Sequence, residues 1–455
     1  MTHFRPHVLV LLVAACGGTG PSSPARPVAR PAKSRPAADA GDILVVATGT
    51  SSDRDDISLA ELSRGYCAGT IAVLASARAT ADARFGCTAR KTVDDVAAFV
   101  ATPAAKRELV VVDFAHLTVQ LKALSIDHHA LVRDPARYPL LDGATPPKLT
   151  HFILTGVTAI TRALGAAVDE HGVDWLTANL RPEFAGADYV HISNEVSIKP
   201  DCTYPTKGTY QFCTKPRDMQ ALIDLGANVI ELTGNHIRDF GDDPFRQTLA
   251  WYAKHDMKTF GGGATPEAAA VPVLVPLAGG KQLGIAGFNE QCPLKECAKR
   301  ADEPGANAYD PAKAKATIAK LREQGADFVI VTVQFREWDN PQPTKTQAAI
   351  SHQLIDDGAD LVYGSQAHQL QYFELYKGKP IFHGLGNLLF DQIHRIGVRQ
   401  AYFTHLYFWQ GRLVQSVPVF TFMADDRQPT LATPEQAAAM RAIVYRDELI
   451  YTPAR

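Results

Sequence analysis

From Leu149 onward, apolar runs of strand length alternate with segments of helical periodicity. Apolar residues at intervals of three and four positions in 244–255 and 344–357 predict helices that pack on a sheet. Strands are expected at 151–154, 189–192, 228–232, 283–287, 327–335, 359–363 and 380–382. Two further apolar runs within 400–423 flank a turn at 409–412, which predicts a closing hairpin. The alternation predicts a layered α/β sandwich.

The preceding segment, residues 42–148, shows the same alternation on a smaller scale. Runs rich in β-branched residues at 43–47, 70–74 and 109–112 lie between Ala-rich, helix-like stretches. Prolines at 135, 139, 146 and 147 mark a joint with the sandwich. We therefore expect a small N-terminal α/β domain, whose role the sequence does not define.

The first residues read as a signal for export. Arg5 precedes an apolar stretch, residues 8–15, that is too short to span a bilayer and is typical of a signal peptide. Ala14-Ala15-Cys16 resembles a bacterial lipobox, which predicts lipidation of Cys16 and a signal peptide over 1–16. The alternative is an ordinary signal peptide cleaved near Ala15, with Cys16 incidental. Lipidation would anchor the exported protein in the cell envelope, on the periplasmic or outer-surface side.

The two ends of the mature chain are expected to lie outside the sandwich. Residues 17–41 are rich in Pro, Ala, Ser and Arg and lack apolar periodicity, so they are expected to form a semi-extended tether. Residues 426–455 are expected to form a helical C-terminal tail.

Composition narrows the class of protein. Apolar residues make up 46% and charged residues 21% of the chain, which is typical of soluble globular domains. The net charge of -2 and the scattered Lys and Arg residues offer no basic face for a phosphate backbone. Nucleic acid is therefore not an expected partner.

Six cysteines beyond Cys16 form three pairs that are close in sequence. The pairs are Cys67 with Cys87, Cys202 with Cys213, and Cys292 with Cys297. In an exported protein this arrangement predicts disulfides that each close a local loop. None of the pairs has the Cys-x-x-Cys spacing of a zinc site, and six buried thiols are the alternative.

Polar side chains gather directly after five of the predicted strands. The clusters are 154–158, 192–195, 232–239, 333–338 and 363–368, and Asn387 follows a later strand. Open α/β sheets bind ligands at the carboxyl ends of their strands, so we expect these side chains to meet in one cleft. A single histidine or glutamate after a strand is more commonly structural or solvated, but five clusters at one sheet edge favour a shared site.

The order of these motifs carries a resemblance to a known family. The motifs are Ser193-Asn194-Glu195, Thr233-Gly234-Asn235-His236 with Asp239-Phe240-Gly241, Phe260-Gly261-Gly262-Gly263, Gln334 with Glu337, Gly364-Ser365-Gln366-Ala367-His368, and Gly384-Leu385-Gly386-Asn387. Together they resemble the CapA family of poly-γ-glutamate capsule synthesis, a branch of the calcineurin-like metallophosphoesterases. The resemblance implies a four-layer metallophosphoesterase-like sandwich over 149–425. It also implies an anionic capsule polymer or its precursors, and capsule synthesis and export membrane proteins, as partners.

Three positions depart from the family pattern. Val157 stands where related phosphoesterases have an aspartate that bridges two metals, and Gln334 and Gln366 stand where many relatives have histidine. The candidate metal ligands that remain are Glu195, Asn235, His236 and His368. A two-metal hydrolase needs several anionic or imidazole ligands, so we expect at most one weakly held Mn, Mg or Zn ion, or none.

Two functions follow, and the sequence leaves both open. In the first, the protein is a hydrolase or transferase in which Glu195, His236 and His368 act as acid and base, with or without one metal ion. In the second, it is a polymer-binding or scaffold lipoprotein with a degenerate metal site. The candidate substrate contacts are Asn194, Gln334, Glu337, Gln366 and Asn387. The missing aspartate favours binding, whereas the retained histidines favour catalysis.

Overall fold

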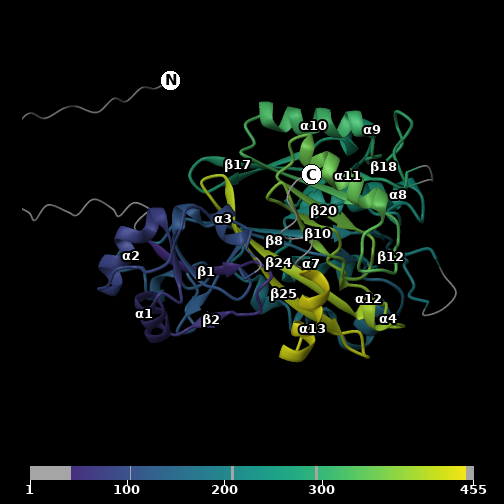
Figure 1. The fold of residues 1–455 in the computed structure, drawn as a ribbon. Helices are drawn as coiled ribbons and strands as arrows, with labels where there is room; N and C mark the ends of the chain where they lie inside the picture. Colours follow the sequence, from purple (N-terminus) through teal and green to yellow (C-terminus); the bar gives the residue numbers. More distant parts are fainter. Residues whose placement is uncertain (1–42, 103, 206–209, 293–295, 447–455) are drawn as a thin grey trace, which may run out of the picture. The chain divides into compact units, whose positions relative to one another are not determined.

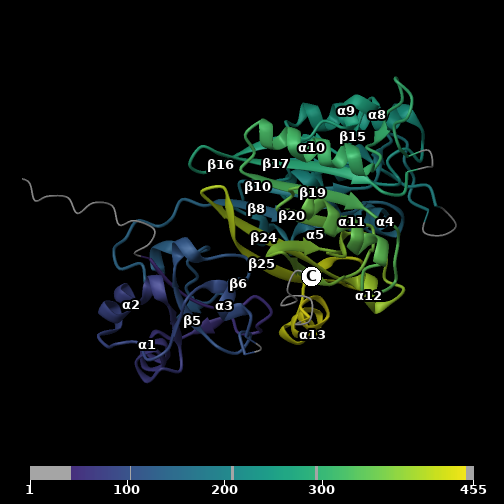
Figure 2. The same cartoon turned by 45° about the horizontal axis from the view of Figure 1, so that its top comes forward.

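Two β-sheets lie face to face in the part of the chain that begins at β8, as Figures 1 and 2 show. The computed structural model describes residues 43–102, 104–205, 210–292 and 296–446. The predicted lipobox at Cys16, the tether and the end of the predicted tail therefore lie outside the described residues.

The larger sheet has nine strands in the order β14-β13-β10-β8-β24-β25-β26, with β9 and β23 joined beside β10. Their bounds are β8 Thr150–Leu154, β9 Val157–Thr158, β10 Tyr189–Asn194, β13 Val229–Glu231, β14 Lys258–Phe260, β23 Asn387–Leu389, β24 Gln400–Trp409, β25 Arg412–Met423 and β26 Pro429–Leu431. The strands β8, β10, β13 and β14 are parallel, so their carboxyl ends meet at one edge.

The second sheet has six strands in the order β16-β17-β19-β20-β22-β21. Their bounds are β16 Val273–Leu277, β17 Lys281–Asn289, β19 Phe328–Gln334, β20 Leu361–Ser365, β21 Phe373–Tyr376 and β22 Lys379–Phe382. Every residue of β19 is buried, because helices cover one face of this sheet and the first sheet covers the other.

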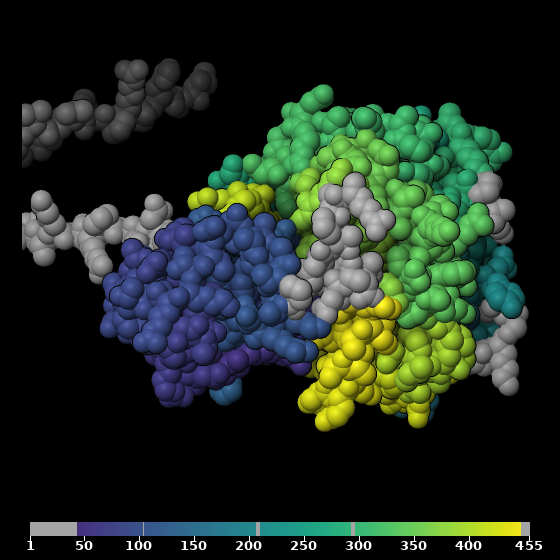
Figure 3. All heavy atoms as spheres, in the orientation of Figure 1, coloured from purple at the N-terminus to yellow at the C-terminus, as the bar shows by residue number. Residues whose placement is uncertain are grey.

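Three apolar clusters separate four layers. Phe152 and Leu406 of the first sheet pack against Ile330 and Tyr363 of the second. The outer face of the first sheet packs on α4 Arg162–His171, α5 Val173–Thr177, α6 Arg181–Phe184, α7 Gln220–Asp224 and α8 Asp242–Lys254. The outer face of the second sheet packs on α10 Pro311–Glu323 and α11 Lys345–Asp356, whose solvent side contributes to the green surface in Figure 3. The predicted four-layer α/β sandwich is confirmed.

The periodicity in the sequence located these elements well. The predicted helices at 244–255 and 344–357 correspond to α8 and α11, and the predicted hairpin corresponds to β24 and β25. Three short helices complete this part of the chain: α9 Pro266–Ala269, α12 Ile396–Arg399 and α13 Pro434–Val444. Two small ladders pair β11 Ser197–Ile198 with β12 Cys213–Thr214, and β15 Gly262–Gly263 with β18 Gly305–Ala306.

The N-terminal segment contains a five-stranded mixed sheet in the order β4-β3-β5-β1-β6. Its strands are β1 Leu44–Gly49, β3 Ala72–Leu74, β4 Thr92–Val93, β5 Val110–Asp113 and β6 Leu121–Ala123. The helices of this segment include α1 Leu59–Ala68, α2 Arg78–Phe85 and α3 Val96–Val100. A separate ladder pairs β2 Asp56–Ile57 with β7 Ser125–Ile126. Gln415 of β25 accepts a hydrogen bond from Ala123 N at 2.9 Å and donates one to Leu121 O at 2.7 Å. The domain boundaries expected from the sequence stay predictions.

Three disulfides have the pairing that the sequence predicts. Cys67 pairs with Cys87, Cys202 with Cys213 and Cys292 with Cys297. Their Cα atoms lie 5.7, 5.9 and 5.8 Å apart, within the range that a disulfide requires. The interpretation as three local disulfides is confirmed.

A histidine pair couples the stability of the sandwich to pH. Nε2 of His151 on β8 lies 2.7 Å from Nδ1 of His405 on β24. Burial, together with the neighbouring His405, lowers the pKa of His151 to about 4. An unfolded histidine titrates near 6.5, so the unfolded chain binds a proton first as the pH falls. We expect the free energy of unfolding to be highest above about pH 6.5 and to fall by on the order of 2 kcal/mol towards pH 4.

Urea unfolding at pH 7.5 and pH 5 measures this loss. His151→Gln should flatten the pH dependence, whereas His171→Gln, which changes a more exposed histidine on α4, should preserve it. If the free energy of unfolding falls equally with pH in His151→Gln and in the unchanged protein, a group other than His151 causes the loss.

Candidate functional site

The ends of neighbouring strands bring the predicted site residues together. Ser193 on β10 is in register with Val157 on β9, and Val157 is in register with Asn387 on β23. On the second sheet, Gln334 at the end of β19 is in register with Ser365 at the end of β20. Side chains from both sheets therefore reach the same edge of the sandwich.

A chain of three amides links the two sheets. Gln334 Nε2 donates to Asn235 Oδ1 at 3.0 Å and to Gln366 Oε1 at 2.6 Å. Gln334 and Gln366 are each 1% exposed. Both hydrogens of the Gln334 amide are thus used within the cluster, and the oxygens of Asn235 and Gln366 face that amide.

Glu195 is the most unusual side chain of the site. It is 1% exposed, and within the described residues neither carboxylate oxygen has a hydrogen-bond partner. Burial raises the pKa of Glu195, although His368 and His236 partly offset that effect. A Cβ atom at Gly234 would lie 2.6 Å from Glu195 Cα, so the loop before His236 needs glycine to pass this close.

His368 is held between two acceptors. Its Nδ1 lies 2.8 Å from Asn387 Oδ1, and its Nε2 lies 3.4 Å from Glu337 Oε1. Burial alone would lower the pKa of His368, but the bond to Glu337 and the charge of Glu195 raise it. The same bond holds the pKa of Glu337 below its usual value. The geometry favours the imidazolium form.

His236 is oriented by a carboxylate and an aromatic ring. Its Nδ1 lies 2.7 Å from Asp239 Oδ2, and its ring centroid lies 4.1 Å from that of Phe212. The guanidinium carbon of Arg162 lies 4.3 Å from the centroid of Phe212, and Arg162 is bonded to Asp391. His236 is more exposed than His368, so it lies nearer to solvent.

The sequence did not assign a site role to several of these neighbours. They are Arg162, Phe212, Asp239, Phe390 and Asp391. Asp239 carried a signal, since it follows His236 by three positions within one motif. The aromatic residues carried none, because their contacts with the histidines join distant parts of the chain.

Asn194, a predicted substrate contact, bonds to partners outside the cluster formed by the other candidates. Its Nδ2 donates to Val196 O at 2.8 Å and to the Tyr252 hydroxyl of α8 at 2.7 Å. Successive residues of a strand point to opposite faces, so Asn194 points towards the helices with its neighbour Ile192. We assign Asn194 to the packing of β10 on α8 instead of to substrate.

The side chains also test the expected metal site. Asn235 Oδ1 already accepts from Gln334, His236 Nδ1 contacts Asp239, and both ring nitrogens of His368 face acceptors. Val157, on β9 between β10 and β23, is 2% exposed and supplies no ligand. Within the described ranges, no group of three or more His, Cys, Asp or Glu side chains is arranged to hold a metal ion. These bonds leave both carboxylate oxygens of Glu195 and Nε2 of His236 unused, so one weakly held ion at this position stays a prediction.

The Cys202–Cys213 disulfide supports the aromatic side of the site. Cys213 follows Phe212, whose ring contacts that of His236 in a tilted arrangement. We expect Cys202→Ser/Cys213→Ser to lower the free energy of unfolding by about 2–3 kcal/mol, because a closed loop of this length constrains the unfolded chain. Urea unfolding measures the loss. The matched double variant Cys67→Ser/Cys87→Ser should destabilise similarly without displacing Phe212, which the NMR shifts of the His236 ring report.

The two packed sheets and their covering helices define a four-layer α/β sandwich with the candidate residues at one edge. The sequence profile of bacterial capsule synthesis protein PGA_cap matches residues 151–392, slightly more than half of the chain. The chain therefore belongs to the PGA_cap family of bacterial capsule synthesis proteins. The predicted family resemblance is confirmed.

Curated relatives support the same family. The chain is 25% identical over 251 residues to capsule biosynthesis protein CapA of Bacillus anthracis, covering 54% of this chain and 60% of that protein. It is 27% identical over 234 residues to PGA biosynthesis protein CapA of Bacillus subtilis (strain 168), covering 51% and 60%. The chain thus spans about 60% of the length of these relatives.

Solved structures overlap with the chain only partially. A 5'-nucleotidase precursor from Thermus thermophilus has a TM-score of 0.39 and 14% identity, covering 65% of this chain and 58% of that one. The NAD nucleotidase of Haemophilus influenzae has a TM-score of 0.37 and 11% identity, covering 65% and 62%. At this level of similarity, we draw no conclusion about the chemistry of the chain from these structures.

Proposed function

We propose that the protein binds a capsule polymer of the poly-γ-glutamate type at the amide cluster, as a non-catalytic component of capsule synthesis or export. One observation carries this proposal. Gln334 donates both of its amide hydrogens to Asn235 and Gln366 at the edge where relatives of the wider class are expected to hold metal. These neutral amides are poor ligands for cations, and because Gln334 and Gln366 are buried, a polymer would contact the half-buried Asn235 and His236 beside them.

The neighbouring charges support an anionic, amide-rich ligand. Burial raises the pKa of Glu195, and His368 is bonded to Glu337, so the buried carboxyl group contributes little negative charge. Arg162 lies on the more exposed side with its guanidinium over Phe212. A carboxylate-bearing chain would meet the guanidinium of Arg162 on this side, where the negative charge of Glu337 is paired with His368.

Binding of poly-γ-glutamate of defined length, measured by titration calorimetry, tests the proposal. Gln334→Leu should weaken binding at least tenfold. Gln347→Leu is a matched control, because Gln347 is also buried and donates to Gln371 Oε1 and His383 O, outside the site. Equal affinity in the Gln334 variant and the unchanged protein would contradict the proposal.

A hydrolase or transferase is the second candidate function. The observation in its favour is the unpartnered carboxylate of Glu195, whose protonation responds to both His368 and His236. Such a group can exchange a proton with a substrate. If the protein shortens the polymer and Glu195→Gln abolishes this activity, the protein is a hydrolase or transferase. The first candidate function would then be wrong. Two metal ions per purified chain would contradict our interpretation of the ligand set.

We further propose that the protein is anchored in the cell envelope by lipid at Cys16 and meets capsule synthesis and export membrane proteins there. In the residues that the structure describes, no helix has the length and apolar character needed to cross a bilayer. We expect Cys16→Ser to release the protein from the membrane fraction or to block its maturation. Membrane fractionation with mass spectrometry of the mature N-terminus measures this. An unacylated N-terminus in the unchanged protein would contradict lipid anchoring.

A further inference from the structure

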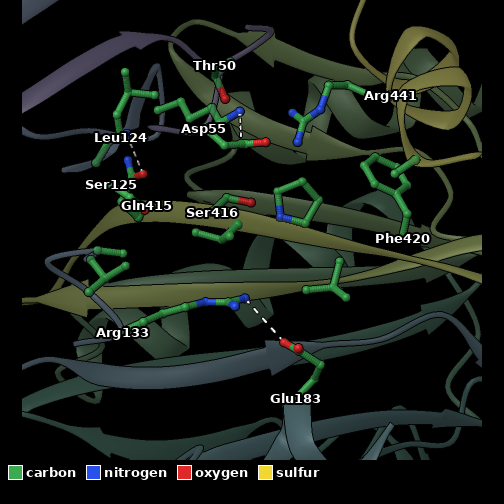
Figure 4. A pocket seen from close by; sticks show the side chains of 18 of the residues that line it. Thr50, Asp55, Leu124, Ser125, Arg133, Glu183, Gln415, Ser416, Phe420 and Arg441 are labelled. Atoms are coloured by element: carbon green, nitrogen blue, oxygen red, sulfur yellow. Dashed lines mark hydrogen bonds and ion pairs between the residues drawn. The ribbon is translucent and has the colours of Figure 1, made fainter. Parts of the chain in front are cut away.

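A cavity outside the candidate site lies between the N-terminal sheet and the strand β25. Its volume is about 430 Å³, within the range of small-molecule sites. One wall is apolar and includes Val417, Val419 and Phe420 of β25 and Leu131 of the N-terminal segment. Figure 4 shows the polar and charged side chains around it. The cavity therefore combines an apolar wall with charged groups.

Two cations meet at one part of this cavity. Lys122 Nζ donates to Ser52 O at 3.0 Å, and Arg441 reaches the same carbonyl at 3.4 Å. Lys122 is also paired with Asp55, but the Asp55 side chain is 72% exposed whereas that of Lys122 is 14% exposed. Burial and the proximity of Arg441 lower the pKa of Lys122. Two like charges thus share one neutral acceptor.

Arg441 is held in place by aromatic rings. Its guanidinium carbon lies 5.7 Å from the centroid of Phe420 and 5.6 Å from that of Tyr445. Within the described residues, no carboxylate forms an ion pair with Arg441. A fixed guanidinium without an acidic partner is suited to binding a carboxylate in a planar, two-point geometry.

The charge balance indicates the class of ligand. Lys122, Arg133 and Arg441 supply three positive charges, and Asp55 and Glu183 supply two negative charges. Glu183 forms an ion pair with Arg133, with 3.6 Å between the nitrogen and the oxygen. One positive charge remains, which matches a monoanion. We propose that this cavity binds an amphipathic monocarboxylate, with its carboxylate between Lys122 and Arg441 and its apolar body along β25. This site is separate from the amide cluster and does not depend on the proposed polymer binding.

Titration calorimetry of the full chain with decanoate tests the proposal. We expect saturable binding of decanoate and at least tenfold weaker binding in Lys122→Met and Arg441→Met, which keep much of the apolar side-chain volume. Lys320→Met on the exposed face of α10 is the matched control and should leave the affinity unchanged. Ala437→Phe fills the cavity from α13 while retaining both cations, so it should abolish binding.

Related probes separate the charge from the apolar body. Decylamine and acetate should each bind at least tenfold more weakly than decanoate. Thermal unfolding of each variant confirms that it is folded before binding is compared. The proposal is overturned if decanoate does not saturate the folded protein, if decylamine binds as tightly, or if Arg441→Met retains full affinity.

Discussion

His368→Ala should weaken poly-γ-glutamate binding at least tenfold and abolish capsule-related function. The substitution removes the imidazole beside Glu195 and leaves the buried Asn387 Oδ1 without its partner, while the exposed Glu337 loses its ion pair. Unpaired buried polar groups cost about 1–3 kcal/mol each, so part of the loss should also appear as lower stability. Calorimetric binding and capsule assays in cells that carry the variant measure the two effects.

His352→Ala is the control for this variant. His352 on α11 also contacts a glutamate, with Nε2 at 2.7 Å from Glu374, but it lies outside the site. It should lower stability without changing polymer binding. His236→Ala should behave like His368→Ala, because the charge of His236 acts on the same carboxylate from the loop after β13. Full function in the double variant His236→Ala/His368→Ala would show that both histidines are structural.

Gly156→Ala should be the most destabilising single substitution near the site. A Cβ atom at this position would lie 2.1 Å from Gly386 O, and this carbonyl also accepts a hydrogen bond from Val157 N at 2.9 Å. Two backbones meet there, so neither can move without breaking the pairing of β9 with β23. We expect a loss of about 3 kcal/mol or more in the free energy of unfolding, measured in urea.

Gly279→Ala separates the steric effect from the general cost of replacing glycine. Gly279 has φ +78°, and a Cβ atom added there would have no neighbouring atom within 4 Å. Its substitution should therefore cost only about 1–2 kcal/mol, through the left-handed backbone. If the two variants lose equal stability, the contact between Gly156 and Gly386 does not constrain the fold.

The sequence predicted where the site lies better than how it works. The strand register brings together at one edge the end of β19 at Gln334, the start of β23 at Asn387, and the residues that follow other strands, Glu195, Asn235, His236, Gln366 and His368. Most of these side chains are deeply buried, and Glu337 lies on the exposed side of the cluster. Burial of a loop residue depends on what packs over it, which local sequence does not reveal.

Asn194 and Glu195 are adjacent in the sequence but have different surroundings, which the motif does not predict. Both belong to one motif, yet Asn194 bonds to Tyr252 behind the sheet, whereas Glu195 interacts with the two histidines. The alternation of the strand decides this division, since Val190 and Ile192 face the helices and Asn194 continues that face.

By itself, the sequence determined the α/β alternation, the helices α8 and α11, the closing hairpin, the local disulfides and the family. Each of these rests on periodicity, on short loop closure or on the order of motifs, all of which are local properties of the chain. Only the tertiary structure decided that Gln334 joins Asn235 to Gln366, that the rings of Phe212 and Phe390 contact the histidines, and that Lys122 meets Arg441. These contacts join residues far apart in the chain, so they depend on strand register and on the packing of one layer against the next.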